Sequence, residues 1–347
     1  MTGSTPLMTI EAREAPARVG ELIAAEGSRI AELGGRLRAL DPPFVLTVGR
    51  GSSDHASLYG RYLFETMLGL VTASAAPSVV TAYGAPLKVR GAFVLGLSQS
   101  GASPDIVRVV EDARRVGALT AAFVNQAGSA LGEAAEVVFS LHAGPERAVA
   151  ATKSFICTAA AAALLTAAWS QDRRLAEALP ALPGSLERAA RQDWSAAIPV
   201  LAGADRMLVV ARGRAFAIAS EIALKMKEVA GIQAEAFSAA EVLHGPMAVV
   251  DPSGPILVLA VEDETLPSVL STMERLKGAG APLVVMSSAD AALSLASVPL
   301  PFARDAHPAL DPLVAVQAFY GFVAALAVAR GLDPDQPPHL AKVTRTL

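Results

Sequence analysis

The sequence predicts an α/β protein built from two similar units, each a largely parallel sheet with helices on both faces. Short apolar runs alternate with longer helical segments, which is typical of strands joined by helical crossovers. Gly51 and Gly213, each in a glycine turn after an apolar run, are 162 residues apart, as are Ser98 and Ala260. A shared offset across separate elements indicates two copies of one unit. Hydrophobic residues form 52% of the 347 residues and aromatic ones 5%, so the cores consist mainly of Ala, Val and Leu, as expected for helices packed on a parallel sheet.

The first copy follows a helical segment. A helix over Met8–Leu40 is expected to break near Gly34-Gly35 and to end at Asp41-Pro42-Pro43. A helix is expected to begin near Asp54, after the first strand and its glycine turn. The predicted strands of this copy are Phe44–Val48, Ser78–Ala82, Ala92–Leu97, Leu119–Val124 and Val137–Leu141. The Ala-rich run Thr158–Trp169 is shorter than the roughly 20 residues that a bilayer span needs, so it predicts a buried helix.

The second copy repeats this plan after a proline-rich join. Its predicted elements are the strands Arg206–Val210, Pro255–Val261 and Pro282–Met286 and the helix Leu266–Lys277. The predicted organisation is therefore an N-terminal helical segment (1–40), a first domain (41–170), a linker (171–202), a second domain (203–332) and a C-terminal tail (333–347).

Composition excludes several classes of function. The net charge of −4 and the lack of a Lys/Arg-rich run argue against a nucleic-acid partner. The segment Met1–Arg13 holds two glutamates and no hydrophobic core, so we expect no signal peptide, no membrane partner and a cytoplasmic protein. The single cysteine, Cys157, excludes an internal disulfide and a cysteine-based zinc cluster, and its apolar setting indicates an inert thiol. No metal site is expected, because no shared ligand spacing connects His55, His142, His307 and His339.

The turn Ser98–Ser103 is the first candidate binding segment, because it joins the run Ala92–Leu97 to a helix that opens at Pro104. A helix N-terminus offers unpaired backbone N–H groups and the positive end of the helix dipole, which favour an anion. The serine and glutamine side chains of the turn add donors, and Gly101 lets the backbone approach a ligand closely. Two interpretations fit the turn by itself: a phosphate cradle, or a helix cap with Ser103 at the N-cap.

The second copy differs at the corresponding turn. Val261–Thr265 there contains Glu262, Asp263 and Glu264, whose negative charges would repel a phosphate. We therefore expect only the first copy to hold an anion.

Several ordered motifs together resemble the sugar isomerase (SIS) family. Gly51-Ser52-Ser53, Ser98-Gln99-Ser100-Gly101 and Ala151-Thr152-Lys153-Ser154-Phe155 look like its sugar-phosphate-binding loops. Residues 221–228, 234–246 and 333–344 are similar to the isomerase half of glucosamine-6-phosphate synthases. The resemblance spans roughly residues 40–347 and is specific, because several motifs agree in order. It implies two tandem SIS domains, each a five-stranded, mainly parallel sheet in a flavodoxin-like three-layer αβα arrangement.

The resemblance also implies a set of substrate contacts, and it favours the phosphate cradle over the simple cap. The phosphate and sugar positions that it carries over are Gly51, Ser52, Ser53, Ser98, Gln99, Ser100, Ser103, Glu146, Val149, Ala151, Thr152 and Ala341. Two positions depart from the pattern of the synthases. Ala151 stands where they have serine, and Ala102 where they commonly have glutamate. The missing hydroxyl at Ala151 leaves the identity of the sugar open.

Glu228 is the candidate base. Moving a carbonyl between C1 and C2 of a sugar phosphate requires a group that carries one proton between adjacent carbons, and a carboxylate shielded from water can do this. On a helix Glu228 shares a face with Lys225, whose cation would tune the carboxylate. Spacing alone favours a surface Lys–Glu pair, whereas the resemblance reverses this preference and implies catalysis.

Two further residues are catalytic candidates through the resemblance. His244 precedes Gly245-Pro246, where a loop can present an imidazole. As a lone histidine it fits a structural hydrogen-bonding role. The resemblance implies instead that it opens the sugar ring, in the site of its own or of a neighbouring subunit. Lys342 lies in the tail, where a lysine is normally solvated. The resemblance places this lysine over the sugar, in a tail that closes the active site, and assigns it a Schiff base with the ketose.

The implied activity is an aldose–ketose shift with ammonia added or lost at C2. A complete synthase also has a glutaminase domain with an N-terminal cysteine, which the first forty residues cannot supply, so we expect no glutamine hydrolysis. The leading hypothesis is conversion of glucosamine 6-phosphate to fructose 6-phosphate and ammonia, with no cofactor. The alternatives are an isomerase or deglycase for another sugar phosphate, such as galactosamine 6-phosphate, and a non-catalytic sugar-phosphate sensor. Apolar helices in excess of what one sheet needs also predict a homodimer.

Overall fold

The computed structural model of this chain describes residues 5–342 and contains two compact units. The N-terminal unit comprises Ala15–Glu146, Lys153–Pro180 and the described residues from Ala341 onward. The C-terminal unit comprises the described residues up to Glu14, together with Arg147–Thr152 and Ala181–Leu340. The expected N-terminal helical segment and tail both extend beyond the described residues, at positions 1–4 and 343–347.

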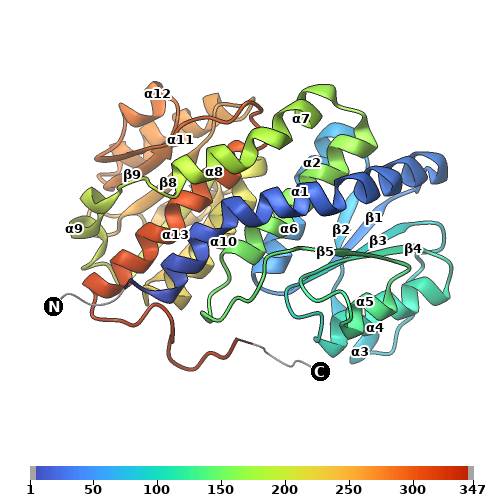
Figure 1. The fold of residues 1–347 in the computed structure, drawn as a ribbon. Coiled ribbons are helices and arrows are strands. Elements are labelled where there is room, and N and C mark those ends of the chain that lie inside the picture. The colour runs from blue at the N-terminus through green and yellow to red at the C-terminus, as the bar shows by residue number, and fades with distance from the viewer. Residues whose placement is uncertain (1–4, 343–347) are drawn as a thin grey trace. The chain divides into compact units, whose positions relative to one another are not determined.

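The N-terminal unit contains a five-stranded sheet in the order β2-β1-β3-β4-β5, and each pair of neighbouring strands is parallel (Figure 1). Its strands are β1 (Val45–Val48), β2 (Thr72–Ser74), β3 (Phe93–Ser98), β4 (Leu119–Val124) and β5 (Val137–Ser140). Its helices are α1 (Leu7–Leu40, whose first turns belong to the other unit), α2 (Ser52–Leu68), α3 (Pro77–Thr81), α4 (Pro104–Arg115), α5 (Ala130–Ala134), α6 (Lys153–Ser170) and α7 (Arg173–Ala178).

The C-terminal unit contains a second parallel sheet, in the order β10-β9-β8-β6-β7. Its strands are β6 (Arg206–Ala211), β7 (Gln233–Ser238), β8 (Ile256–Ala260), β9 (Leu283–Ser287) and β10 (Val298–Pro301). Its helices are α8 (Leu182–Ala189), α9 (Ile198–Leu201), α10 (Arg214–Glu228), α11 (Leu266–Gly278), α12 (Asp290–Leu293) and α13 (Asp311–Ala329), with short 3-10 helices η1 (Leu179–Ala181), η2 (Ser195–Ala197), η3 (Glu241–His244) and η4 (Pro246–Val249). Both sheets have the strand order 2-1-3-4-5 within their own copy, so the predicted duplication and fold class are confirmed.

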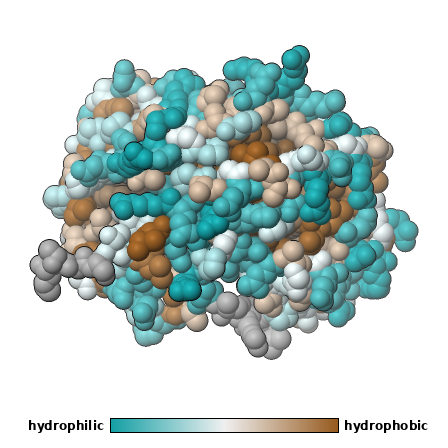
Figure 2. All heavy atoms as spheres, in the orientation of Figure 1, coloured by the Kyte–Doolittle hydropathy of each residue, from teal (hydrophilic) through white to brown (hydrophobic). Residues whose placement is uncertain are grey.

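Two of the helices, α6 and α13, are long and apolar enough to cross a membrane. Buried residues make up 83% of the window in α6 and 78% in α13, as in the core helices of a globular protein. On the face shown in Figure 2 hydrophilic side chains predominate and hydrophobic atoms form separate patches. The abundant apolar residues therefore serve mainly to fill the cores.

Two local predictions are wrong. Residues 78–82 were expected to form a strand but lie mostly in helix α3, because Pro77 at the first helical position starts a helix, and the edge strand is the preceding β2. Helix α1 continues through Gly34-Gly35 without a break. A side chain at Gly34 would meet the backbone and Cβ of Ala168 at 3.0 Å, so this glycine permits two helices to approach closely rather than ending one.

Candidate functional site

The first group of site residues lies where β1 and β3 end. These strands are neighbours, and the chain leaves β1 toward α2 and β3 toward α4 at the same edge of the sheet. In an open sheet of this order, ligands bind in the crevice at the carboxyl ends of these two strands. Two helix N-termini, those of α2 at Ser52 and of α4 at Pro104, therefore direct positive dipole ends to one edge.

The turn after β3 holds two of its hydroxyl groups by hydrogen bonds from its own backbone. The Ser98 hydroxyl accepts a hydrogen bond from the backbone N–H of Gly101 (3.0 Å), and the Ser100 hydroxyl accepts one from the N–H of Ala102 (3.3 Å). A hydroxyl that accepts in this way keeps its own hydrogen to donate to another oxygen. Ser103 occupies the N-cap position and Pro104 the first helical position, as the cap interpretation predicts, but the Ser103 side chain makes no capping hydrogen bond. The turn therefore has features of both interpretations, and its donors suit an anion.

Gly101 is required by this geometry. Its φ of +62° lies in the left-handed region, and a Cβ there would stand 2.0 Å from the Ser129 hydroxyl. Gly51 similarly adopts φ +53° just before α2 and brings Ser52 and Ser53 to that helix N-terminus.

An ion pair that the sequence did not reveal joins the loop after β1 to the first turn of α4. Both Nε and Nη2 of Arg50, in the loop after β1, donate to Oδ2 of Asp105, at 2.9 and 2.7 Å. Asp105 is the second residue of α4, only 1% exposed, and its Oδ1 accepts the N–H of Ile106 at 2.9 Å. The sequence shows an arginine inside the glycine turn 49–51, but no motif or helical spacing connects this arginine to Asp105.

Glu146 and Lys342 meet within the N-terminal unit. The Lys342 ammonium donates to Glu146 Oε2 at 2.8 Å, and the Glu146 side chain is fully buried. Ser154, in the first turn of α6, donates to the same carboxylate through its backbone N–H (3.1 Å) and its hydroxyl (2.7 Å). The structure thus brings together a residue expected to line the sugar and the candidate Schiff-base lysine, while the adjacent Ala341 is exposed.

Val149, Ala151 and Thr152 belong instead to the C-terminal unit. The N–H of Val149 donates to the Asp335 carbonyl at 3.3 Å, and Thr152 is fully buried. The carboxylate of Asp335 in turn accepts the first backbone N–H groups of α1, those of Leu7 and Met8, both at 2.7 Å. These bonds attach the start of the tail to the first turn of α1 and to residues 147–152, which contain the predicted sugar contacts Val149, Ala151 and Thr152.

The candidate base lies in a buried charge cluster on α10. Glu228 is the last residue of the helix, and its Oε2 lies 2.6 Å from Nζ of Lys225. Lys225 is 1% exposed and also pairs with Glu221, which is fully buried, at 3.3 Å. Burial by itself lowers the pKa of Lys225, but the carboxylates of Glu221 and Glu228 outweigh it, so the pKa is raised and the ammonium stays charged. The pair is therefore not a surface pair.

Two members of this cluster were missed from the sequence. Glu221 lies one turn before Lys225, a spacing that could have identified it. Tyr320, on α13, donates its hydroxyl to Glu221 Oε1 at 3.3 Å and could be found only from the tertiary structure. The Glu228 side chain is 22% exposed and that of Glu221 is fully buried, so Glu228 is the more accessible carboxylate of the two.

His244 stands apart from this cluster. It ends η3, is exposed, and precedes Gly245, whose φ of 148° turns the chain sharply. Among residues 5–342 its ring makes no hydrogen bond, so the structure leaves it available to a ligand or another chain without assigning it a role.

In the second copy, the carboxylates of the corresponding loop, residues 262–264, lie close to arginine side chains. Arg214 lies 3.1 Å from Glu264 and 3.8 Å from Asp263, and Arg304 lies 2.7 Å from Glu262. The carboxylates of this loop thus lie beside arginines of their own unit, which reduces the negative charge on which the expectation of no phosphate rests, and that expectation stays a prediction.

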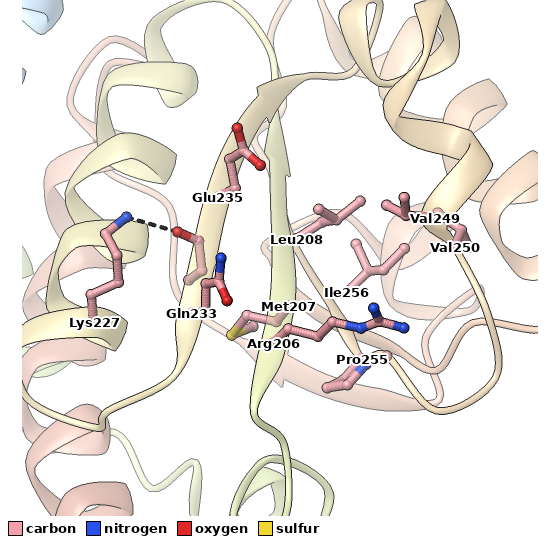
Figure 3. A pocket seen from close by; sticks show the side chains of 12 residues that line it. Arg206, Met207, Leu208, Lys227, Gln233, Glu235, Val249, Val250, Pro255 and Ile256 are labelled. Atoms are coloured by element: carbon pink, nitrogen blue, oxygen red, sulfur yellow. Dashed lines mark hydrogen bonds between the residues drawn. The ribbon is translucent and has the colours of Figure 1, made fainter.

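A cavity of about 560 Å³ lies elsewhere in the C-terminal unit (Figure 3). It opens at the amino ends of three strands, opposite to the edge where ligands usually bind in such sheets. Its lining includes Arg206–Leu208, Gln233–Glu235, Gly254–Ile256 and Lys227, which donates to the Ala234 carbonyl at 2.7 Å. None of the predicted site residues lines this cavity.

Comparison with known proteins adds an independent observation. The SIS domain family matches residues 43–168 and 200–328. The glutamine–fructose-6-phosphate aminotransferase (isomerizing) of Aeropyrum pernix is 35% identical over 316 residues, covering 86% of this chain and 50% of that protein. The protein of the same name from Thermus thermophilus is 32% identical over 340 residues, covering 89% and 55%. The chain thus spans about half the length of the curated relatives it matches.

Solved structures match over nearly the whole chain. A protein of Silicibacter pomeroyi, proposed to be a phosphosugar isomerase, has a TM-score of 0.88 at 38% identity, covering 95% of this chain and 100% of that one. The C-terminal domain of glucosamine-fructose-6-phosphate aminotransferase from Francisella tularensis has a TM-score of 0.86 at 24% identity, covering 96% and 99%. Glucosamine-6-phosphate deaminase from Thermotoga maritima has a TM-score of 0.75 at 20% identity, covering 98% and 100%. The last two likenesses concern the fold alone.

Proposed function

Because this chain belongs to the SIS (sugar isomerase) domain family, we propose that it is a phosphosugar isomerase acting on an amino-hexose 6-phosphate. The specific reaction proposed is conversion of glucosamine 6-phosphate to fructose 6-phosphate and ammonia. The observation that carries this proposal is the buried cluster of Glu221, Lys225 and Glu228, which presents one partly exposed carboxylate held against a charged ammonium. A purely sugar-binding protein has no need for such a cluster.

The proposed chemistry is a proton transfer between adjacent carbons. His244 opens the sugar ring by moving a proton from the C1 hydroxyl to the ring oxygen, which yields the aldehyde. Glu228 then removes the proton from C2 and returns it to C1, while the C1 oxygen gains the proton that the amine nitrogen gives up. The C1 aldehyde thereby becomes a CH₂OH group and the amine at C2 becomes an imine. Water adds to this imine, and ammonia leaves. One water is consumed and one ammonia is released, with no redox change.

The phosphate is proposed to bind at the edge formed by β1 and β3. Two helix N-termini and the hydroxyls of Ser98 and Ser100 supply donors there, and the left-handed Gly101 lets a ligand approach the backbone. Binding of the non-reacting phosphate positions C1 and C2 for the proton transfer.

The ion pair of Lys342 with Glu146 favours the deaminase over a route through an enzyme Schiff base. The Lys342 ammonium is held by Glu146 Oε2 at 2.8 Å, so an attack by this nitrogen on a carbonyl requires the ion pair to be broken. An amino sugar needs no such attack, because its own nitrogen forms the C2 imine. In this proposal Lys342 therefore contributes charge and position.

The test is release of ammonia and appearance of a ketose from a panel of hexosamine 6-phosphates. We expect turnover of glucosamine 6-phosphate by the wild-type protein and at least a roughly thousandfold lower kcat for Glu228→Gln, with sugar-phosphate binding retained. Glu274→Gln, which changes an exposed glutamate on α11, is the matched control and should be fully active. Absence of both ammonia and ketose with every sugar, from folded wild-type protein, would refute the proposal.

A second candidate is an isomerase or deglycase for another sugar phosphate. The observation in its favour is Ala151, which lacks the hydroxyl that the synthases place near the sugar. Turnover of galactosamine 6-phosphate in preference to glucosamine 6-phosphate would select it. A non-catalytic sensor would instead bind a sugar phosphate without exchanging hydrogen at C1 or C2 with deuterated water.

We also propose a homodimer in which His244 serves the site of the neighbouring subunit. Mixing Glu228→Gln and His244→Ala subunits then regenerates one intact site in each mixed dimer, so about a quarter of the wild-type activity should return. If His244 acts within its own subunit, mixing restores nothing.

A further inference from the structure

Residues 147–152, all of which the structure describes, carry three of the predicted sugar contacts but lie in neither a helix nor a strand. The backbone N–H groups of such a segment take their hydrogen-bond partners from elsewhere in the fold, and these partners decide where the segment lies. The N–H groups of Arg147 and Ala148 donate to the two carboxylate oxygens of Glu11, at 2.6 and 3.1 Å. Glu11 is on α1 and is 3% exposed, so a buried carboxylate holds the start of the segment.

Asp335 supplies the next bond and attaches the tail to α1. Its carbonyl accepts the N–H of Val149 at 3.3 Å, and its carboxylate accepts those of Leu7 and Met8, both at 2.7 Å. A carboxylate at the positive end of a helix dipole forms charge-assisted hydrogen bonds, which are stronger than neutral ones. The tail is therefore fixed firmly to the first turn of α1.

The two acidic residues and the three N–H groups of residues 147–149 form a closed ring of hydrogen bonds, which we call the clamp. Asp335 binds the start of α1, and Glu11 lies within one turn of the N–H groups that Asp335 binds. Both then bind residues 147–149. All members of the clamp belong to the C-terminal unit. Loss of the Asp335 carboxylate would release the end of the helix that carries Glu11, so it would affect all three bonds to the segment.

Another aspartate shows what a helix cap without such a link looks like. The carboxylate of Asp172 accepts the N–H of Leu175 at 2.8 Å at the start of α7. Among the described residues, the hydrogen bonds of Asp172 stay within positions 170–176. Capping alone therefore does not require a bond to a distant loop, whereas Asp335 combines its cap with a bond to the segment that carries the predicted contacts.

We propose that Asp335 is a positioning residue for the sugar. By fixing the tail to the first turn of α1, it completes the clamp and keeps Val149, Ala151 and Thr152 where they can contact the sugar. Asp335 takes no part in the proton transfer and does not hold the phosphate. This inference rests on the proposed sugar-phosphate site.

The experiment compares the binding of two probes, glucose 6-phosphate and inorganic phosphate, by calorimetry, which requires no turnover. Asp335→Ala should weaken the binding of glucose 6-phosphate at least about fivefold, because the clamped segment loses its place beside the sugar. The affinity for inorganic phosphate should stay within about twofold of wild type, since this probe has no sugar for the segment to contact.

Asp172→Ala is the matched control, because it removes a helix cap of the same kind. It should leave both affinities unchanged. Both alanine variants should lower the urea midpoint of unfolding, since each removes a cap. Stability therefore does not distinguish the two aspartates, whereas the ratio of the two affinities does.

Asp335→Asn carries the test if Asp335→Ala does not fold. Its side chain has nearly the same shape and keeps one accepting oxygen, but its NH₂ group faces a backbone N–H, so the affinity for glucose 6-phosphate should fall at least about threefold. A smaller loss in the variant measured, or an equal loss of affinity for inorganic phosphate, overturns the proposal, because Asp335 would then act as a helix cap alone. Wild-type protein that binds no glucose 6-phosphate would overturn the proposed function itself, and that result differs from a loss confined to the variants.

Discussion

Replacing Lys225 by methionine tests the buried cluster on α10 most directly. Lys225 is 1% exposed, and its ammonium lies 3.3 Å from Glu221 and 2.6 Å from Glu228. Methionine fills a similar volume, so the change removes the charge with little change in packing. The change takes the Lys225 cation away from Glu221, which is fully buried.

The expected loss is about 3–5 kcal/mol in the free energy of unfolding at pH 8, since breaking a buried ion pair leaves an uncompensated charge. Lys227→Met on the same helix is the matched control. Lys227 is exposed and bonds a backbone carbonyl at 2.7 Å, so its replacement should cost about 1 kcal/mol or less.

The assay is urea unfolding followed by tryptophan fluorescence. The two tryptophans lie in different units, Trp169 in the N-terminal and Trp194 in the C-terminal one, so a Trp169→Phe background reports the unit that contains α10. The double variant Lys225→Met/Glu221→Gln should recover most of the loss. A loss below about 1 kcal/mol would refute the argument that Lys225 compensates a buried carboxylate.

Three further predictions concern other parts of the chain. Gly101→Ala should lower stability by about 2 kcal/mol or more and weaken sugar-phosphate binding, because its Cβ would stand 2.0 Å from the Ser129 hydroxyl at φ +62°. Adding Ser129→Gly to this variant should recover part of both losses. Equal stability of wild type and Gly101→Ala in urea unfolding would contradict this prediction. Burial raises the pKa of Asp311 to about 7, above its unfolded value near 4, so the folded state holds this proton more tightly. Stability should therefore fall as the pH rises from about 4 to about 7, and Asp311→Asn should remove this dependence. Parallel pH profiles of stability for the two proteins would argue against it. Burial also raises the pKa of the Cys157 thiol, so a disulfide reagent should label it only as the N-terminal unit unfolds; rapid labelling in native buffer would show the thiol to be accessible.

Much of the fold followed from local pattern. The strands β3 and β4 were predicted to within one residue, because continuous apolar runs between turns are a strong signal for buried parallel strands. The error at residues 78–82 arose where an apolar Val-Val pair follows a proline, since helix and strand share such short runs. The expected break of α1 failed because Gly34 packs against another helix, a contact that spacing does not reveal.

In the candidate site, too, local spacing predicts some contacts and only the tertiary structure reveals others. The partnership of Lys225 with Glu228 follows from helical spacing, and the geometry agrees with it. The bond between Arg50 and Asp105 joins residues 55 positions apart, and that between Lys342 and Glu146 joins residues 196 apart. Such pairs depend on which strand ends are neighbours and where the tail runs, so no motif contains them.

The sequence by itself determined the duplication, the parallel α/β units and the residue types available for phosphate binding and proton transfer. These follow from periodicity and from local order, which operate over a few residues. Only the tertiary structure decided that Lys225 is buried between two carboxylates, that Lys342 is bound to Glu146, and that Arg50 pairs with Asp105. Burial and pairing over long distances arise from packing of the whole unit, and they set the charge states on which the proposed chemistry depends.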